Sequence, residues 1–152
     1  MTYNQKRHRQ LLKRSQDLKN QRKNLFIENQ EEDFELSEYN IAVEEHIFWQ
    51  ERYNLALSIE DFLNGKIDGE ELCNIVYGLR NKLRKRVKKF QVDLISGKIT
   101  DFQPEEGSNE LSGFLTGCFC CCEDFMENYE NEEFYTSIKN GFLNLQKVLD
   151  ED

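Results

Sequence analysis

The residues best suited to chemistry in this sequence are a group of cysteines within five positions, namely Cys118, Cys120, Cys121 and Cys122. Cys118 and Cys121 have the C-x-x-C spacing of zinc sites and redox dithiols. A structural zinc site needs four thiolate or imidazole ligands. The chain offers no second pair, because Cys73 stands alone and only two histidines occur. The C-x-x-C pair is therefore an incomplete metal site.

The cysteines also fit the apolar face of a helix. If residues 108–129 are helical, then Cys118, Cys121 and Cys122 fall on the face that carries the leucines of this segment. Free cysteine is among the most often buried residues, so we interpret these three as small core hydrophobes. Cys120 points away from that face and is expected to be exposed. Metal-dependent or redox regulation through the C-x-x-C pair is the alternative.

No other group of residues indicates catalysis. A helical di-metal site needs two E-x-x-H pairs, and neither is present. The two histidines form no Ser-His-Asp arrangement, and the chain has no G-x-G-x-x-G motif or phosphate loop. Residues 64–71 resemble the second half of a calcium-binding loop, but Phe62 occupies a position that must supply a ligand oxygen. We therefore predict a non-enzymatic protein without metal or cofactor.

Charge is distributed in four blocks of alternating sign. Residues 1–27 have a net charge of +7, and residues 28–72 have a net charge of −12. Residues 73–92 carry seven cations and no acid, whereas residues 93–152 have a net charge of −11, and the whole chain stands at −9. Blocks of one sign attract their opposites, either within the chain or on a partner. The sequence leaves both arrangements open.

The composition favours helices and an intracellular location. Of the 152 residues, 38% are hydrophobic and 12% are aromatic, which can supply a core, and a single proline leaves few helix breakers. No run of about 18 apolar residues is present. Residues 1–16 lack the apolar centre of a secretory signal, and the clustered cysteines make a poor disulfide framework. We expect a reducing compartment, either cytoplasm or plastid stroma.

The N-terminal third of the chain predicts an arm followed by a longer helix. Residues 5–27 are rich in helix formers but have a narrow apolar stripe, which predicts a helix loosely attached to the body. An acidic linker, residues 28–35, follows this arm. Residues 37–63 then show helical spacing, with the first residue as N-cap and a core stripe that includes Ile41 and Tyr53.

Three further helices are predicted. The next one opens with Asp68 as N-cap and Glu71 three residues later, and its apolar stripe continues to Phe90. Its C-terminal half is basic, which places cations at the negative end of the helix dipole. After a loop over residues 96–109, helices from about residues 108 and 131 complete the set with a short connection between them.

Four apolar stripes with short connections predict an all-α fold, an antiparallel four-helix bundle preceded by the basic N-terminal helical arm. We divide the chain into residues 1–36, the arm and acidic linker, and residues 37–152, the bundle domain. This arrangement buries the stripes and leaves the charged groups outside.

Two charged surfaces are the candidate binding sites. Dense acid on a rigid bundle suits a basic protein partner through electrostatic steering, and a loosely packed basic helix suits docking. The predicted partner-binding acids, at two separate hairpin ends, are Glu60, Asp61, Asp68, Glu70, Glu71, Glu123, Asp124, Glu127 and Glu130. The predicted anchor, with nucleic acid as one candidate partner, is Lys6, Arg7, Arg9, Lys13, Arg14, Lys19, Arg22 and Lys23.

The second basic run, residues 80–89, is interpreted as a solvated helix face that nearby acids neutralise. Aromatic side chains are nearly absent from both basic segments, apart from Tyr3 and Phe90. Stacking on single-stranded bases therefore has little support from the sequence.

Residues 57–72, LSIEDFLNGKIDGEEL, resemble the opening of the colicin-type immunity protein family, in which such a glycine-lysine-isoleucine turn precedes a helix opened by an acid. Residues 111–125 and 133–135 are similar to the closing helical hairpin of that family, and the chain also resembles open reading frames of cyanobacteria and plastids. The resemblance covers residues 55–149, leaving out the basic arm, and the cysteine cluster is not part of the family pattern. It implies a small helical bundle that binds and blocks a basic nuclease, with its acids standing in for nucleic-acid phosphates.

We therefore expect a non-enzymatic, immunity-like helical bundle that binds a basic partner protein, such as a nuclease, through its acidic surface. The alternative is an accessory subunit of a ribosome- or polymerase-type nucleic-acid machine, anchored by residues 1–27.

Overall fold

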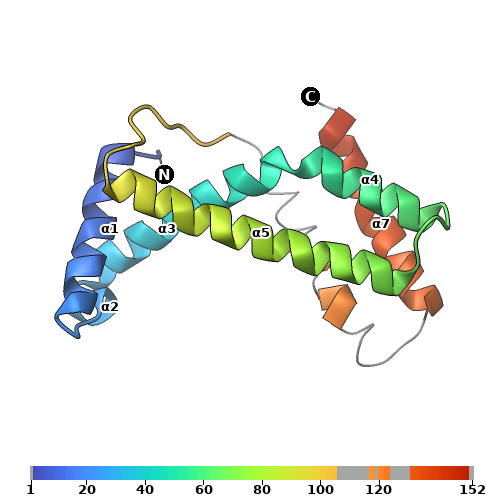
Figure 1. The fold of residues 1–152 in the computed structure, drawn as a ribbon, viewed down its shortest axis with the longest axis horizontal. Coiled ribbons are helices and arrows are strands. Elements are labelled where there is room, and N and C mark those ends of the chain that lie inside the picture. The colour runs from blue at the N-terminus through green and yellow to red at the C-terminus, as the bar shows by residue number, and fades with distance from the viewer. Residues whose placement is uncertain (1, 106–116, 119, 124–130, 151–152) are drawn as a thin grey trace.

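The computed structural model describes residues 2–105, 117–118, 120–123 and 131–150 (Figure 1). Its helices are α1 (Gln5–Asn20), α2 (Leu25–Glu28), α3 (Gln30–Gln50), α4 (Arg52–Leu63), α5 (Gly69–Ile95) and α7 (Asn131–Asp150). Residues 117–118 and 120–123 are also helical. These ranges contain no strand, so the all-α prediction is confirmed. The antiparallel four-helix bundle is not confirmed, because most of the helix predicted over residues 108–129 lies outside the described ranges.

The long helix α5 connects two groups of helices (Figure 1). At one end, α1 and α2 pack with α3, and α1 also contacts α5. At the other end, α4 and α7 pack against each other and against α5. Helices at both ends of the molecule therefore contact α5, and α5 determines how the two groups are placed relative to each other.

Helix α1 is docked firmly, so the expected loose attachment of the arm is wrong. His8 and Leu11 are 0% and 1% exposed, and Leu12 is also buried. The apolar stripe is narrow, as the sequence indicates, but α3 and α5 both contact α1, so the stripe is buried between them. Arg9 adds a polar contact, since its Nε donates to the carbonyl oxygen of Ile95 at 3.3 Å.

The buried histidine of α1 is accommodated by a chain of hydrogen bonds. His8 Nε2 lies 2.8 Å from Asn40 Oδ1 on α3, and its Nδ1 lies 2.9 Å from the Tyr3 hydroxyl. A carboxamide oxygen only accepts, so Nε2 carries the proton and Nδ1 accepts from Tyr3. Gln91 of α5 donates to the same Asn40 oxygen at 3.2 Å. Three helices are thereby joined through one neutral imidazole, and its burial lowers the pKa of His8.

Two asparagines decide where the N-terminal helices begin. Asn24 accepts from the backbone N–H of Phe26 and opens α2, and Asn29 accepts from that of Glu32 and opens α3. The predicted acidic linker is therefore the start of α3, where acids favour the positive end of the helix dipole. Ser37 was predicted to be the N-cap of this helix, but it lies inside α3. The predicted domain boundary between residues 36 and 37 also falls inside this helix.

The predicted stripe of the next segment is wrong at Ile41 and Tyr53, which are 52% and 54% exposed. The core face of α3 includes Tyr39 and Val43, and a residue two positions from each lies on the opposite side of the helix. The helix also breaks at Glu51, so the phase of the stripe changes when α4 begins.

The turn between α4 and α5 is confirmed. Gly65 has a φ of 76°, which suits glycine after the end of α4. Asp68 Oδ1 accepts from the backbone N–H of Glu71 at 2.8 Å, as predicted for the N-cap of α5. Helix α5 continues to Ile95, however, so the cations of residues 80–89 do not lie in its last turn. The prediction that they complement the helix dipole is wrong, and Arg9 of α1 occupies that position instead.

Helix α7 begins at residue 131 as predicted, and Phe134, Ile138 and Phe142 are buried. Residues 98–105 are non-helical, in agreement with the predicted loop. The short connection near residue 130 and the stripe over residues 108–116 lie outside the described part of the chain.

Docking of α1 is testable with two identical substitutions at sites of opposite burial. Leu11→Ala should lower the free energy of unfolding by about 3 kcal/mol, because it leaves a cavity between packed helices. Leu57→Ala, at a site that is 60% exposed, should change it by less than about 0.5 kcal/mol. Urea denaturation followed by circular dichroism measures both. Equal effects of the two substitutions would contradict the docked position of α1.

The free energy of unfolding should also decrease as the pH is lowered, because of His8. Because the pKa of His8 is lowered in the folded state, the unfolded chain binds more protons as the pH drops below about 6.5. The stabilisation is therefore complete above that pH and is lost below it. The stability difference between the wild type and His8→Gln should narrow between about pH 7.5 and 5.5 in urea denaturation. A constant difference would mean that His8 does not contribute to the pH dependence.

Candidate interaction surfaces

Three of the eight predicted anchor cations are used inside the fold. Arg7 donates to both carboxylate oxygens of Glu35 at 2.9 and 3.0 Å, and this hydrogen bonding holds the pKa of Glu35 below its usual value. Arg14 Nε lies 2.8 Å from Glu32 Oε2, an ion pair without hydrogen-bond geometry. Arg9 contacts the end of α5. The first basic block and the acidic block that follows it therefore attract each other within the chain.

The other five anchor cations make no ion pair with the part of the chain that the structure describes. All of them are exposed, and they are spread along α1 and the turn after it: Lys6, Lys13, Lys19, Arg22 and Lys23. The arm therefore retains a basic surface, but it is part of the helical body.

Five of the nine predicted partner-binding acids lie around the turn between α4 and α5. Of these, Glu60, Asp68, Glu70 and Glu71 are exposed, and Asp61 is half-buried and 3.8 Å from Lys66. Glu123 is exposed on the segment of residues 120–123. The remaining predicted acids, Asp124, Glu127 and Glu130, lie outside the described residues.

The fold adds acids from α7 to the same end of the molecule. Tyr135 donates from its hydroxyl to the carbonyl oxygen of Leu63 at 3.4 Å, and the rings of Phe62 and Phe134 are 5.4 Å apart. The first turn of α7, with its exposed Glu132 and Glu133, therefore lies against the C-terminal end of α4. This contact adds two acids of α7 to those predicted at the turn between α4 and α5. We call this region, residues 60–71 and 132–133, the acidic end.

Exposed apolar side chains adjoin the acidic end. Tyr53 and Leu57 are 54% and 60% exposed and lie two turns and one turn, respectively, before Glu60 on the outer face of α4. Tyr135 is also exposed. The guanidinium of Arg52 stacks over Tyr53 at 4.5 Å and orients that ring. Aromatic side chains beside charged ones are typical of protein-binding surfaces.

The second basic run is only partly neutralised. Glu51 accepts from Lys82 and Arg86, each at 3.1 Å, and its hydrogen bonds to Asn54 and Lys82 lower its pKa. Four further cations on α5 are exposed and form no ion pair within the described ranges, namely Arg84, Lys85, Lys88 and Lys89. We call these four the cationic row.

The cysteines form a cluster that includes one residue from outside the C-x-x-C segment. Cys73 of α5, Cys118 and Cys122 are at most 2% exposed, and Cys73 and Cys122 interact with each other. Cys121 is half-buried and Cys120 is exposed, as predicted from the helical face. Cys73 was not predicted to join this cluster, although its place between Leu72 and Val76 in the core stripe of α5 was a signal.

The environment of this cluster favours the protonated form of its three buried thiols. Burial raises the pKa of Cys118 to about 12, and burial raises the pKa values of Cys73 and Cys122 as well. A protonated thiol is a poor nucleophile and a poor metal ligand. Within the described residues, no group of three or more histidine, cysteine or acidic side chains has an arrangement that could hold a metal ion.

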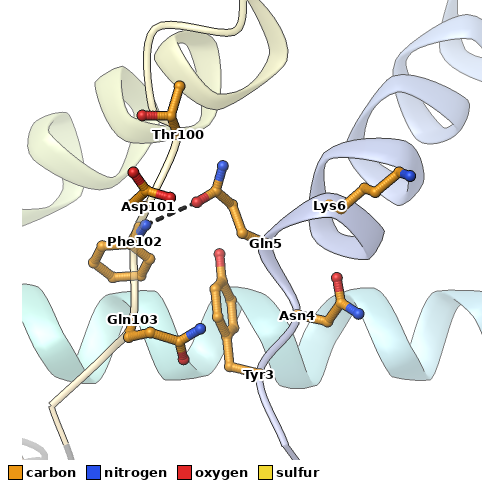
Figure 2. Close-up of a pocket in the computed structure, with 8 residues that line it drawn as sticks. All are labelled: Tyr3, Asn4, Gln5, Lys6, Thr100, Asp101, Phe102 and Gln103. Carbon is orange, nitrogen blue, oxygen red and sulfur yellow. Dashed lines mark hydrogen bonds between the residues drawn. The ribbon is translucent and has the colours of Figure 1, made fainter.

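A loop residue is placed beside α5 by the N-terminus of α1. Gln5 donates to the carbonyl oxygen of Ile99 at 2.8 Å. It also accepts from the backbone N–H of Phe102 at 2.8 Å (Figure 2). This paired contact fixes residues 99–102 next to Tyr3, where a shallow cavity of about 470 Å³ opens (Figure 2).

Phe102 also forms one wall of a second cavity, on α5. This cavity has a volume of about 440 Å³ and lies between His46 of α3, residues 86–93 of α5 and the loop. The Phe102 ring packs edge-on against Phe90, with centroids 4.7 Å apart, and against His46 at 5.0 Å. His46 Nδ1 accepts from the backbone N–H of Glu105 at 2.9 Å, and burial lowers the pKa of His46. The cavity therefore has aromatic walls and a neutral imidazole.

No family model, curated protein or solved structure matches the chain. The resemblance to colicin-type immunity proteins thus stays a prediction. Among the described residues, no helix combines the length and apolarity needed to cross a bilayer.

Differences in burial predict an order of thiol reactivity. In the native protein, Cys120 should react with a maleimide first, since it is the exposed thiol, whereas Cys73, Cys118 and Cys122 should react only after denaturation. Peptide mapping by mass spectrometry after timed labelling measures each site. Labelling of Cys73 as fast as that of Cys120 would contradict the buried cluster.

Proposed function

We propose that this chain is a non-enzymatic, immunity-like helical bundle that binds a basic protein, such as a nuclease, through the acidic end. The observation that carries the proposal is the contact of α7 with α4, which adds Glu132 and Glu133 to the acids of the α4–α5 turn. Concentrated charge of one sign steers an oppositely charged partner to its site.

The neighbouring apolar residues support a protein as the partner. Tyr53 and Leu57 are large, exposed and contiguous with Glu60 on one face of α4. An interface needs desolvated apolar contacts in addition to charge, because exposed ion pairs contribute little affinity by themselves. The resemblance of residues 57–72 to immunity proteins covers the same turn and supports the same partner class. The free cysteines are consistent with the proposed reducing compartment.

The alternative, anchoring to a nucleic-acid machine through residues 1–27, has less support. Arg7 and Arg14 pair with acids of α3, and Arg9 contacts the end of α5. These cations have internal partners, so fewer are available for an external one.

The acidic end can be tested without disturbing a helix cap. The variant Glu60→Gln, Glu70→Gln, Glu71→Gln removes three exposed charges and leaves Asp68 in place as the N-cap. In affinity purification with quantitative mass spectrometry, the wild type should retain a basic protein, and the variant should retain it at least about tenfold less, mostly through slower association. Added salt should weaken capture by the wild type.

The matched control is Glu28→Gln, Glu31→Gln, Glu38→Gln, which removes three exposed charges on α2 and α3. It should retain the basic partner as the wild type does. If the control loses the partner equally, net charge and not the acidic end is responsible. If neither variant changes the captured proteins, the proposal is wrong.

A further inference from the structure

The cavity on α5 and the cationic row are adjacent. Lys89 belongs to both, and Lys85 lies one helical turn before it on the same side of α5. Lys88 lies beside Lys85, three residues later, but it is about 100° around the helix from Lys89. A ligand that follows the row toward the C-terminal end of α5 therefore arrives at the cavity.

The two features have complementary chemistry. The cavity is lined by the apolar side chains of Phe90, Ile99 and Phe102 and by the cation Arg86. The row presents four exposed cations without ion pairs among the described residues. Positive side chains that track a backbone, next to an aromatic surface for a base, are the two elements of single-strand recognition.

We propose that this face binds single-stranded nucleic acid, with one base in the cavity against Phe102 and the adjoining phosphates on Lys85, Lys88 and Lys89. The site lies on α5 and does not use the N-terminal cations or the acidic end. Base stacking had little support from the sequence because Phe102 is 12 residues from Phe90 along the chain.

Nearby acids limit but do not cancel the local positive charge. Asp93 lines the cavity, Glu105 lies near His46, and Glu51 is already occupied by Lys82 and Arg86. The protein as a whole carries −9, but charges farther than about 10 Å are largely screened at 0.1 M salt. Short-range contacts with the row therefore decide whether a phosphate binds.

The phosphate contacts are tested with the full chain and a fluorescein-labelled oligothymidylate in anisotropy titrations at several salt concentrations. The variant Lys85→Gln, Lys88→Gln should weaken binding about tenfold at low salt. It should also reduce the slope of log affinity against log salt by about 1.4, because each phosphate contact contributes about 0.7 on a single strand. The control Lys19→Gln, Lys23→Gln removes the same charge at the end of α1 and the following turn and should change affinity less than twofold.

The base contact is tested with Phe102→Leu, which keeps apolar bulk but removes the aromatic face. It should weaken oligothymidylate binding about tenfold and leave binding of heparin, an anionic polymer without bases, unchanged. The control Phe26→Leu, on α2 at a site 47% exposed, should have no effect. Lys89→Glu places an acid at the exposed edge of the cavity without altering its wall, and it should weaken oligothymidylate binding more than tenfold.

Four results would overturn the proposal. These are no binding of oligothymidylate by the wild type at low salt, equal losses in the two double-lysine variants, unchanged binding in Lys89→Glu, and a Phe102→Leu protein that is folded by circular dichroism and binds as the wild type does. If the Phe102→Leu protein binds both oligothymidylate and heparin as the wild type does, the face is a general anion-binding surface.

Discussion

One face of α1 is buried between α3 and α5, and the arrangement of that end of the molecule depends on this contact. Leu11 supplies apolar burial, and His8 connects the N-terminus to Asn40 and, through it, to Gln91. An imidazole in such a place must stay neutral and keep both nitrogens hydrogen-bonded, because an unpaired buried polar group is costly. The contact therefore specifies the position of α1 as well as its attachment.

The position of α1 has two consequences beyond its own helix. Arg9 reaches the last turn of α5, where its positive charge interacts favourably with the negative end of the helix dipole. Gln5 holds the backbone of Ile99 and Phe102 and so places an aromatic ring over Phe90. Without the N-terminal helix, the loop after α5 would lose Gln5, whose side chain hydrogen-bonds to the backbone of both Ile99 and Phe102.

The sequence predicts the parts of this structure that depend on local signals. Helix type, the Asp68 cap, the stop at Gly65 and the inward face of α7 all follow from spacing and turn chemistry over a few residues. The phase of the stripe over residues 37–63 could not be predicted correctly, because the break at Glu51 has no glycine or proline to mark it. Short polar caps such as Asn29 were also missed, since the acidic run after it is equally typical of a linker.

The candidate sites required contacts between residues far apart in the chain. Cys73 joins Cys122, and Phe102 joins Phe90 and His46, only after the helices pack. The use of Arg7 and Arg14 inside the fold likewise depends on the position of α1 beside α3. Composition could show that acids and cations are segregated in blocks, but it could not show which blocks neutralise each other.

The geometry of α5 determines how the two proposed binding surfaces relate. Glu71, in its first turn, and Lys85, in the cationic row, are separated by 14 residues, or about 21 Å along the helix axis at 1.5 Å per residue. This distance is about twice the screening length at 0.1 M salt, so the acidic end scarcely reduces the potential at the row, and the row scarcely repels a basic partner. A helix this long thus lets one chain of net charge −9 keep an acidic and a basic surface apart. Folding the same residues into a shorter, rounder bundle would bring the two surfaces within range of each other and favour internal neutralisation, as already happens between α1 and α3.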